Sequence, residues 1–209
     1  MRQIIVVGGG AAGMMAAVAA AEAGAAVTLL EKNEKLGKKI YITGKGRCNL
    51  TNAAPMREVQ AQVVSNPRFL YSAFRALTNE DVMRFFERAG CPLKTERGER
   101  VFPVSDHASD VIRALEREMQ AKGVRVRLNT EVRDLLFSGE AEARSVTGVL
   151  LANGDKLFAD AVILATGGLS YPATGSTGDG YRFAEAAGMT LTERYPSLVP
   201  LILKEQESC

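Results

Sequence analysis

Short apolar runs alternate with helical patterns from the start of the chain, and this order predicts an α/β fold. Residues 4–7 form an apolar run, residues 14–23 form an alanine-rich stretch, and residues 26–30 form a second β-type run. Continuous apolar runs of this length are typical of strands that are covered on both faces of a parallel sheet. The chain therefore begins with a predicted strand, a helix and a parallel strand.

The middle of the chain shows the periodicity of amphipathic helices. Residues 67–77 and 79–89 carry apolar residues at helical spacing, and Thr78 with Asn79 is placed to cap the second helix. The aromatic residues of both stretches recur on one helix face. This favours a role in the core over contact with a cofactor.

The next segments predict a hairpin, a helix and a strand. Residues 93–102 alternate around a turn and predict the hairpin. Residues 108–122 predict a helix that Ser105 or Asp106 caps, and residues 124–128 alternate as a strand.

The last third of the chain predicts a second sheet and a return to the first. Residues 130–137, 145–151 and 155–158 read as a three-stranded antiparallel layer, with turns at glycine-containing positions. Residues 160–165 form another buried parallel strand. The remaining predicted elements are a helix over residues 181–187 and a strand over residues 190–193.

A glycine-rich turn joins the first strand to the first helix. Gly8, Gly10 and Gly13 form the pattern G-x-G-x-x-G, which lets the backbone approach a pyrophosphate at the start of a helix. Glu31 ends the second strand, near the spacing of about 20 residues expected for a carboxylate on ribose hydroxyls. The alternative is a glycine turn in another α/β protein. The pattern favours a ligand with an ADP moiety and leaves FAD and NAD(P) both open.

A long connection, residues 31–58, follows the second strand. Loops of this length within compact domains are uncommon and usually functional. This loop combines glycines, lysines, an arginine and asparagines, a mixture suited to a phosphate or an electron-rich ring. The alternative is a solvated basic loop, and we favour the site.

Composition and charge exclude several classes of protein. Hydrophobic residues make up 46% and charged residues 24% of the 209-residue chain, which is ordinary for a soluble protein. A net charge of +2 gives no reason to expect a nucleic acid or an anionic membrane as partner. The sequence lacks an apolar run of membrane-spanning length and a cationic leader. A cytoplasmic protein is the simplest interpretation.

Cysteine and histidine are too few to build a metal site. Cys48, Cys91 and Cys209 are widely spaced, so the sequence predicts neither a disulfide framework nor a metal-binding pair. With His107 as its single histidine, the chain is a poor candidate for a Ser-His-Asp triad. We expect His107 to be a surface or capping residue.

Two runs carry a resemblance to a known family. The runs GKKIYITGKGRCNLTN (37–52) and ATGGLSYPATGSTGDGYRFAEAAG (165–188) resemble the aminoacetone oxidase-like FAD-dependent oxidoreductases. That family includes bile-acid-reductase-like flavoproteins and belongs to the glutathione-reductase-type superfamily with two dinucleotide-binding domains. The resemblance extends to about Pro200. It implies a Rossmann-like FAD-binding domain with a parallel sheet, flanking helices and a three-stranded antiparallel β layer, holding extended, noncovalent FAD.

The motifs and the resemblance together assign a set of cofactor-binding residues. The resemblance gives Val132 a backbone contact with adenine and places Asp179 beside the cofactor; for Asp179 a turn or N-cap role is an equal alternative. The full set is Gly8, Gly10, Ala11, Ala12, Gly13, Glu31, Lys32, Lys39, Thr43, Gly44, Gly46, Arg47, Cys48, Asn49, Val132, Ala165, Thr166, Gly167 and Asp179.

Few side chains are candidates for catalysis, as flavin chemistry permits, because the cofactor carries the reaction. Arg47 and Asn49 are candidates to polarise a flavin or substrate carbonyl. Cys48 has no partner cysteine nearby, which favours a packed or cofactor-adjacent thiol over a nucleophile.

The resemblance also implies a domain organisation. Members of that family are about twice as long, with a second domain inserted after residues 196–201 and a returning segment that completes the FAD site. We therefore expect residues 1–190 to be an FAD-binding domain without its return segment. Residues 191–209 are expected to begin a truncated inserted domain.

The leading functional hypothesis is a flavin-dependent oxidoreductase in which FAD carries hydride or electrons to or from a small organic substrate. NAD(P)H is a candidate electron donor. Two alternatives stay open: an FAD- or ADP-binding fragment without turnover, and the NAD(P)-binding domain of a dehydrogenase. The sequence does not identify the substrate or the oligomeric state.

Overall fold

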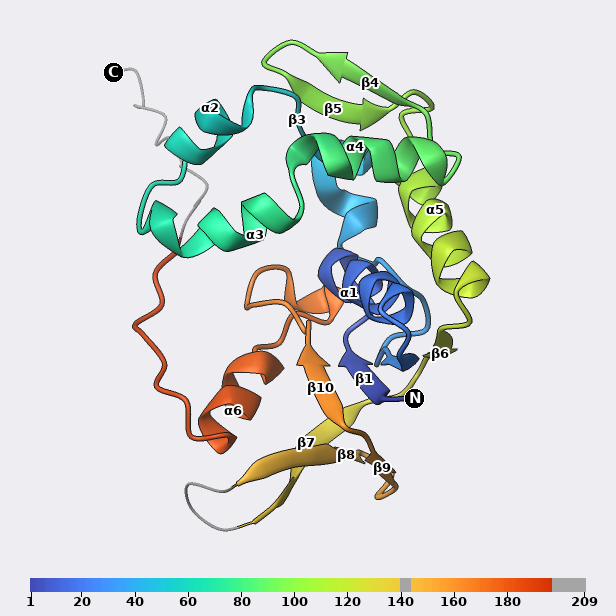
Figure 1. The fold of residues 1–209 in the computed structure, drawn as a ribbon, viewed down its shortest axis with the longest axis vertical. Helices are drawn as coiled ribbons and strands as arrows, with labels where there is room; N and C mark the ends of the chain where they lie inside the picture. The colour runs from blue at the N-terminus through green and yellow to red at the C-terminus, as the bar shows by residue number, and fades with distance from the viewer. Residues whose placement is uncertain (140–143, 197–209) are drawn as a thin grey trace, which may run out of the picture.

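A four-stranded parallel sheet forms the centre of the protein (Figure 1). The computed structural model describes residues 1–139 and 144–196. The strand order is β10-β1-β2-β6, and each neighbouring pair is parallel. Its strands are β1 (Gln3–Val7), β2 (Ala26–Leu30), β6 (Arg125–Arg127) and β10 (Ala161–Leu164). The predicted strand, helix and parallel strand at the start of the chain are thus confirmed.

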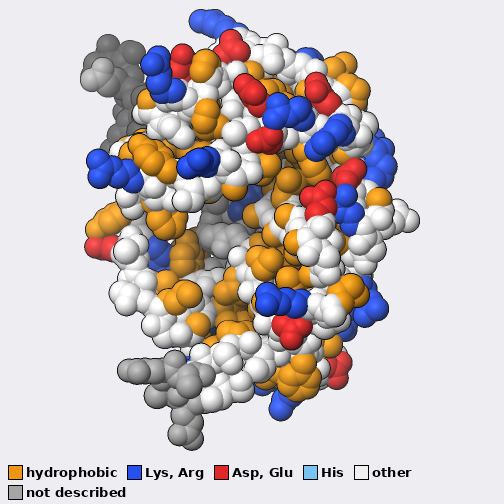
Figure 2. All heavy atoms as spheres, viewed as in Figure 1, with side chains coloured by type: hydrophobic (Ala, Val, Ile, Leu, Met, Phe, Trp, Pro, Cys, Tyr) orange, Lys and Arg blue, Asp and Glu red, His pale blue; other side chains and the backbone are white. Residues whose placement is uncertain are grey.

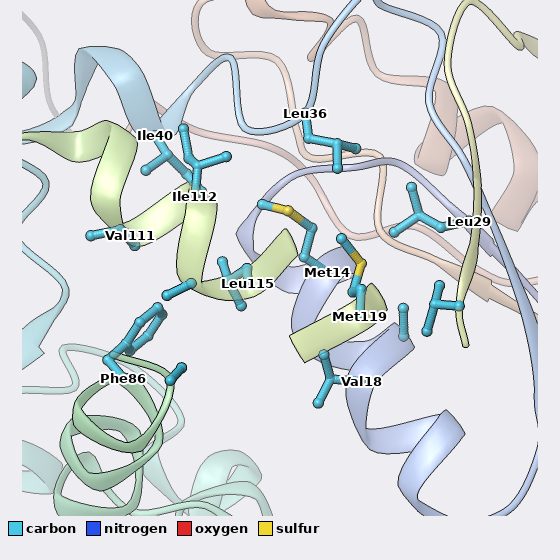
Figure 3. Packing of buried hydrophobic residues seen from close by; sticks show 14 of the residues in the cluster. Met14, Val18, Leu29, Leu36, Ile40, Phe86, Val111, Ile112, Leu115 and Met119 are labelled. Atoms are coloured by element: carbon cyan, nitrogen blue, oxygen red, sulfur yellow. The ribbon is translucent and has the colours of Figure 1, made fainter. Parts of the chain in front are cut away.

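Helices cover one face of this sheet. Helix α1 (Ala11–Glu22) packs against α5 (Ala108–Ala121), and α4 (Asn79–Arg88) packs against α5 in turn. Met14 and Val18 of α1 and Met119 of α5 meet in a core that also includes Leu29 of β2 and Phe86 of α4 (Figure 3).

The antiparallel layer covers the opposite face. It consists of β7 (Val132–Ser138), β8 (Ser145–Leu151) and β9 (Lys156–Phe158) in the order β7-β8-β9, as predicted. Ile5 and Val7 of β1 lie in a second core with this layer, whereas Val6 lies in the helical core. Alternate side chains of β1 are therefore buried on opposite faces. Phe183 of α6 (Asp179–Ala186) completes the second core.

A smaller sheet and short helices form the upper part of the molecule in Figure 1. The hairpin β4 (Leu93–Glu96) and β5 (Arg100–Pro103) was predicted, and β3 (Thr51–Asn52) adds to it in the order β3-β5-β4. The short helices are α2 (Met56–Ala61), α3 (Tyr71–Ala76) and the 3₁₀ turns Ile40–Gly46 and Pro67–Leu70. A further 3₁₀ turn, Pro172–Thr174, lies between β10 and α6.

Several local predictions were wrong. The long connection contains a 3₁₀ turn, β3 and α2, because pairing of β3 with distant β5 creates a strand that local pattern does not indicate. The predicted helix over residues 67–77 is divided into a 3₁₀ turn and α3. Phe69 lies in that turn and is 79% exposed, so it is not a core residue. Residues 190–193 form no strand.

The cap of α5 also differs from the prediction. His107 is the N-cap, and no side-chain hydrogen bond caps the helix. Asp106 has a left-handed backbone, and its carboxylate instead accepts hydrogen bonds from Arg47 and Lys94. Ser105 Oγ accepts a hydrogen bond from the His107 backbone N–H.

The expected second domain falls largely outside the described part of the chain. Of residues 191–209, residues 197–209 are not described, and residues 191–196 adopt no helix or strand. The boundary at residue 190 stays a prediction. None of the helices within residues 1–139 and 144–196 is long and apolar enough to cross a membrane.

The predicted cap of α4 is confirmed and gives a test of the fold. Thr78 Oγ1 accepts from the Asp81 backbone N–H at 3.1 Å, while the Asp81 carboxylate accepts from the Thr78 backbone N–H at 2.9 Å and from its hydroxyl at 2.6 Å. The hydrogen bonds from Thr78 and from Arg84 lower the pKa of Asp81 to about 2.

Replacing Thr78→Ala should lower the free energy of unfolding by about 1 kcal/mol near pH 7 in urea denaturation. Because the pKa of Asp81 is lowered on folding, its contribution is complete above its ordinary pKa of 3.8 and is lost as the pH falls through about 2. The effect of the substitution should shrink over that range. Thr190→Ala, at an exposed position outside any helix or strand, is the control, and equal losses in both variants would contradict the cap.

Candidate functional site

Three parallel strands end at one cavity. Gly8 follows β1, Glu31 follows β2 and Ala165 follows β10, and all three line a cavity of about 320 Å³. We call it the strand-end cavity. In the sheet, β1 lies between β10 and β2. The strand-end cavity is therefore a crevice at the point where the connections after neighbouring strands leave the sheet on opposite sides. This is the usual ligand position in open α/β sheets. Figure 2 shows the molecule hollowed left of centre, between the α3 region and α6.

The glycines of the first turn have distinct spatial roles. Gly8 has φ +108°, and a Cβ there would overlap the carbonyl oxygen of Ala165. A Cβ on Gly13 would overlap the carbonyl oxygen of Gly8, so this glycine lets α1 lie directly on the end of β1. A Cβ on Gly10 would meet no atom within 4 Å, and Gly10 lines the strand-end cavity. The space beside Gly10 is therefore left for a ligand.

The start of α1 opens onto the same space. Gly10 is its N-cap and supplies no side-chain hydrogen bond, and Ala11 and Ala12 line the cavity. The first N–H groups of a helix have no partner within the helix, and the helix dipole favours negative charge beside them. This end of the cavity is therefore suited to a phosphate.

Glu31 is a buried carboxylate held on both oxygens. The residue is 7% exposed. Oε2 accepts a hydrogen bond from the Gly9 backbone N–H at 2.6 Å, and Oε1 accepts from the Asn33 backbone N–H at 2.8 Å and from Asn33 Nδ2 at 2.6 Å. These bonds fix the orientation of the carboxylate at the wall of the cavity.

Two lysines join the segment after β2 to the loop before α6. Lys39 Nζ donates to Ser176 Oγ at 2.6 Å and to the Ser170 carbonyl at 2.8 Å. Lys32 Nζ donates to Asp179 Oδ2 at 2.7 Å and to Thr177 Oγ1 at 2.6 Å. Residues 170–179, which we call the cavity loop, are thereby held across the strand-end cavity.

The Lys32–Asp179 pair is only partly buried, with side-chain exposures of 25% and 23%. Burial raises the pKa of the Asp179 carboxyl, but the hydrogen bonds from Lys32 and Thr177 outweigh burial and leave the pKa below its ordinary value. Asp179 is also the first residue of α6, where a carboxylate is favourable to the helix dipole. The N-cap of α6 is Gly178, so the turn or N-cap alternative for Asp179 was wrong, and Asp179 lines the cavity from within the helix.

Most of the residues assigned from the sequence meet at this cavity. Those that line it are Gly8, Gly10, Ala11, Ala12, Glu31, Lys32, Lys39, Thr43, Val132, Ala165, Thr166, Gly167 and Asp179. Those outside the lining are Gly13, Gly44, Gly46, Arg47, Cys48 and Asn49. Gly13 acts on the cavity through its contact with Gly8, and the others belong to one loop.

That loop, residues 43–49, is bound to the β4–β5 hairpin. Arg47 forms ion pairs with Glu96 and Asp106 and lies 4.1 Å from the ring centre of Phe102. The hydrogen bonds to Glu96 and Asp106 raise the pKa of Arg47. The arginine that was a candidate for catalysis is thus engaged with the hairpin.

Cys48 is buried, and the exposed Asn49 is engaged with neighbouring backbone. In the amide orientation that satisfies both of its groups, the Asn49 side-chain nitrogen donates to the Val101 carbonyl at 3.2 Å and to the Thr51 carbonyl at 3.0 Å. Cys48 is a free, buried thiol whose pKa is raised by burial, against a smaller effect of Thr43. A raised pKa disfavours the thiolate, so Cys48 is a packed thiol.

The cavity also contains residues that the sequence did not assign. Asn33, Thr174 and Ser176 could have been found from their place beside Glu31 and within a glycine-rich run, whereas Phe183 enters the cavity only because α6 packs on the second core. The unassigned lining residues are Val7, Gly9, Leu30, Asn33, Lys38, Ile40, Thr130, Glu131, Thr174, Gly175, Ser176 and Phe183.

The donor set fits the ADP half of a dinucleotide. Apolar side chains of Val132, Leu30 and Phe183 suit a base, and the buried carboxylate of Glu31 suits ribose hydroxyls. The open helix start at Gly10 and the amine of Lys39 suit phosphates. The residues present therefore fit the cofactor predicted from the sequence.

Comparison with known proteins identifies the family. Residues 2–194 match the family model described as HI0933-like protein Rossmann domain. The chain belongs to this family. The predicted family and the predicted Rossmann-like fold class are confirmed.

Curated relatives of this HI0933-like chain include two kinds of enzyme. It is 37% identical over 181 residues to the 3-dehydro-bile acid delta(4,6)-reductase of Clostridium scindens, covering 87% of this chain and 42% of that protein. It is 33% identical over 182 residues to the ribosomal RNA dihydrouridine synthase of Escherichia coli, covering 87% and 43%. The chain thus spans less than half the length of these relatives.

Solved structures share the fold. An open-conformation flavocytochrome c3 fumarate reductase is similar with a TM-score of 0.61 and 25% identity, over 88% of this chain and 40% of that chain. The 3-ketosteroid delta1-dehydrogenase of Sterolibacterium denitrificans has a TM-score of 0.60 and 17% identity, over 80% and 48%. The second likeness is one of fold alone.

The different surroundings of two motif glycines give a test of the site. Gly13→Ala should lower the free energy of unfolding by about 1–3 kcal/mol, because its methyl group overlaps backbone that cannot move independently. Gly10→Ala should leave the stability of the ligand-free protein nearly unchanged, because its methyl group meets open space. Urea denaturation measures both, and a larger loss in Gly10→Ala would contradict this arrangement.

Proposed function

We propose that this chain is the FAD-binding part of a flavin-dependent reductase that saturates a carbon–carbon double bond in a small organic molecule. The observation that carries the proposal is the strand-end cavity, where the open start of α1 at Gly10 lies beside the buried carboxylate of Glu31. FAD supplies the hydride and electron chemistry when it is bound. The residues of the chain bind it and orient it.

The proposed binding roles follow from the contacts. Gly8, Gly10 and the N–H groups of Ala11 and Ala12 receive the pyrophosphate, and Glu31 accepts a hydrogen bond from the ribose. Val132, Ala165, Thr166, Gly167 and Thr43 supply close-packed walls. Lys32 and Lys39 place positive charge beside the phosphates and hold the cavity loop, and Asp179 fixes Lys32.

Residues 44–49 have a supporting role in this proposal. Gly44, Lys45, Gly46 and Cys48 all have positive φ, and Arg47 holds the loop against Glu96 and Asp106. A loop with this many left-handed residues is held by its surroundings, and such strain is often found at functional sites. We propose that the loop supports Thr43 in the cavity wall while Arg47 and Asn49 maintain its shape.

The substrate class is inferred from the names of the relatives. A delta(4,6)-reductase and a dihydrouridine synthase both saturate a carbon–carbon double bond, and in both the bond is conjugated to a carbonyl group. A double bond of this kind accepts a hydride at one carbon and a proton at the other. We propose a small conjugated ketone as substrate, NAD(P)H as electron donor and a cytoplasmic location.

An RNA base is the second candidate substrate. The expectation that nucleic acid is not a partner is opposed by the ribosomal RNA dihydrouridine synthases of E. coli and Haemophilus influenzae, which are 33% and 32% identical to this chain. The small-molecule proposal rests on the higher identity, 37%, to the bile-acid reductase and on the net charge of +2. A binding fragment without turnover and an NAD(P)-binding domain are the remaining alternatives.

The cofactor proposal predicts a yellow protein. Purified or FAD-reconstituted protein should show the visible absorption bands of oxidised flavin. Gly10→Val should abolish FAD retention, because its side chain enters the space left at the helix start, while the unfolding transition of the ligand-free protein persists. Ala61→Val, at an exposed position of α2, should retain FAD. Retention of FAD by Gly10→Val would contradict the proposed site, and selective binding of NAD(P) would favour the dehydrogenase alternative.

The substrate proposal predicts selective reoxidation. FAD-loaded protein that has been reduced anaerobically should recover its oxidised spectrum faster with a 3-oxo-4,6-diene steroid acid than with uridine-containing ribosomal RNA. Saturated product should form in proportion. Reoxidation with RNA alone, together with dihydrouridine formation, would overturn the small-molecule proposal and favour the second candidate.

A further inference from the structure

Asn33 makes several hydrogen bonds at the cavity, although none of the sequence motifs assigns it a role. Its side-chain Nδ2 donates to Glu31 Oε1 at 2.6 Å and to the Thr174 carbonyl at 3.2 Å, and its Oδ1 accepts from Lys38 Nζ at 3.3 Å. Both donors and the acceptor of the amide are therefore used. Asn33 lies between Glu31 and the cavity loop and lines the strand-end cavity.

Three hydrogen bonds occupy most of the acceptor positions of the Glu31 carboxylate. An ionised carboxylate offers about four acceptor positions. Glu31 Oε1 receives two hydrogen bonds from Asn33, through its backbone N–H and Nδ2, and Oε2 receives one from the backbone N–H of Gly9. The remaining position is on Oε2. The carboxylate is thus fixed from both sides, with one acceptor left for a ligand.

We infer that Asn33 is a positioning residue that aims Glu31 Oε2 at a ribose hydroxyl of the bound nucleotide. The inference rests on the proposed function. Without the Nδ2 donor, the buried carboxylate loses one of three fixed bonds and gains other orientations, so less of its population presents Oε2 to the hydroxyl. Preorganisation of this kind raises affinity by lowering the entropy lost on binding.

Asn33 has contacts that fit two roles, support of the cavity loop and orientation of Glu31. A Cβ on Gly175 would lie 2.6 Å from Asn33 Nδ2, so the asparagine also fits closely under the cavity loop. Truncation of Asn33 could therefore loosen the loop and weaken every ligand equally. A role through Glu31 instead weakens only ligands that carry ribose hydroxyls. The nucleotide used as a probe decides between the two roles.

The test compares ADP with 2′,3′-dideoxy-ADP by isothermal titration calorimetry on the 209-residue chain. Asn33→Ala should weaken ADP binding about tenfold, the size of one hydrogen bond to a charged group, and leave dideoxy-ADP binding unchanged. Asn33→Asp keeps the shape of the side chain but removes its donors and places a like charge beside Glu31, so it should weaken ADP binding further. In a Glu31→Ala background, Asn33→Ala should have no additional effect.

Four results would contradict the positioning role of Asn33 or the function on which it rests. Equal weakening of both nucleotides by Asn33→Ala, or an undiminished effect in the Glu31→Ala background, would overturn the positioning role. ADP affinity in Asn33→Asp equal to that of the wild type would overturn it as well, and this variant controls for packing because it has the same size. If the wild-type chain binds neither ADP nor FAD, the proposed function itself fails, and the inference with it.

Discussion

The close approach of three backbone segments at the end of β1 is the constraint on which the site depends. Gly8 lies against the Ala165 carbonyl on one side and Gly13 on the other, and neither contact leaves room for a Cβ. This contact brings the start of α1 onto the ends of β1 and β10. The open helix start therefore faces the strand-end cavity, and among the described residues no side-chain hydrogen bond caps α1 at Gly10.

A second layer of polar contacts depends on this arrangement. Because β2 lies beside β1, Glu31 reaches the Gly9 backbone N–H, and its carboxylate joins the glycine loop to the segment that follows β2. Asn33, Lys32 and Lys39 continue the network to the cavity loop. Residues separated by more than a hundred positions thus form one wall. Burial makes the hydrogen bonds of Glu31 costly to lose, since a buried charge without partners is strongly unfavourable.

The two candidate catalytic residues make structural contacts in this fold. The candidate catalytic residues Arg47 and Asn49 are engaged with the β4–β5 hairpin and the backbone beside it. Within the described residues, the charged groups at the cavity are arranged for binding, with lysines paired to oxygen atoms of the cavity loop. This is the division of labour expected where the cofactor carries the reaction and the protein orients it.

The sequence by itself determined the four strands of the parallel sheet, the glycine turn and Glu31. Each follows from short-range rules: apolar period, positive φ and the spacing of one βαβ unit. It also determined the cap of α4 by Thr78. The strand β3 and the diversion of Asp106 from the cap of α5 depend on partners distant in sequence, β5 and Arg47.

The sequence motifs identified the candidate site residues. They did not indicate which of these residues line the cavity and which belong to the supporting loop. Thr43 and Arg47 belong to one continuous motif, yet Thr43 lines the cavity and Arg47 pairs with Glu96 and Asp106. A left-handed run between them turns the chain. The Thr43 hydroxyl donates to the Ile40 carbonyl, whereas contacts with the hairpin fix the direction of Arg47. Side-chain direction is set by contacts from the whole fold, and therefore only the tertiary structure decided it.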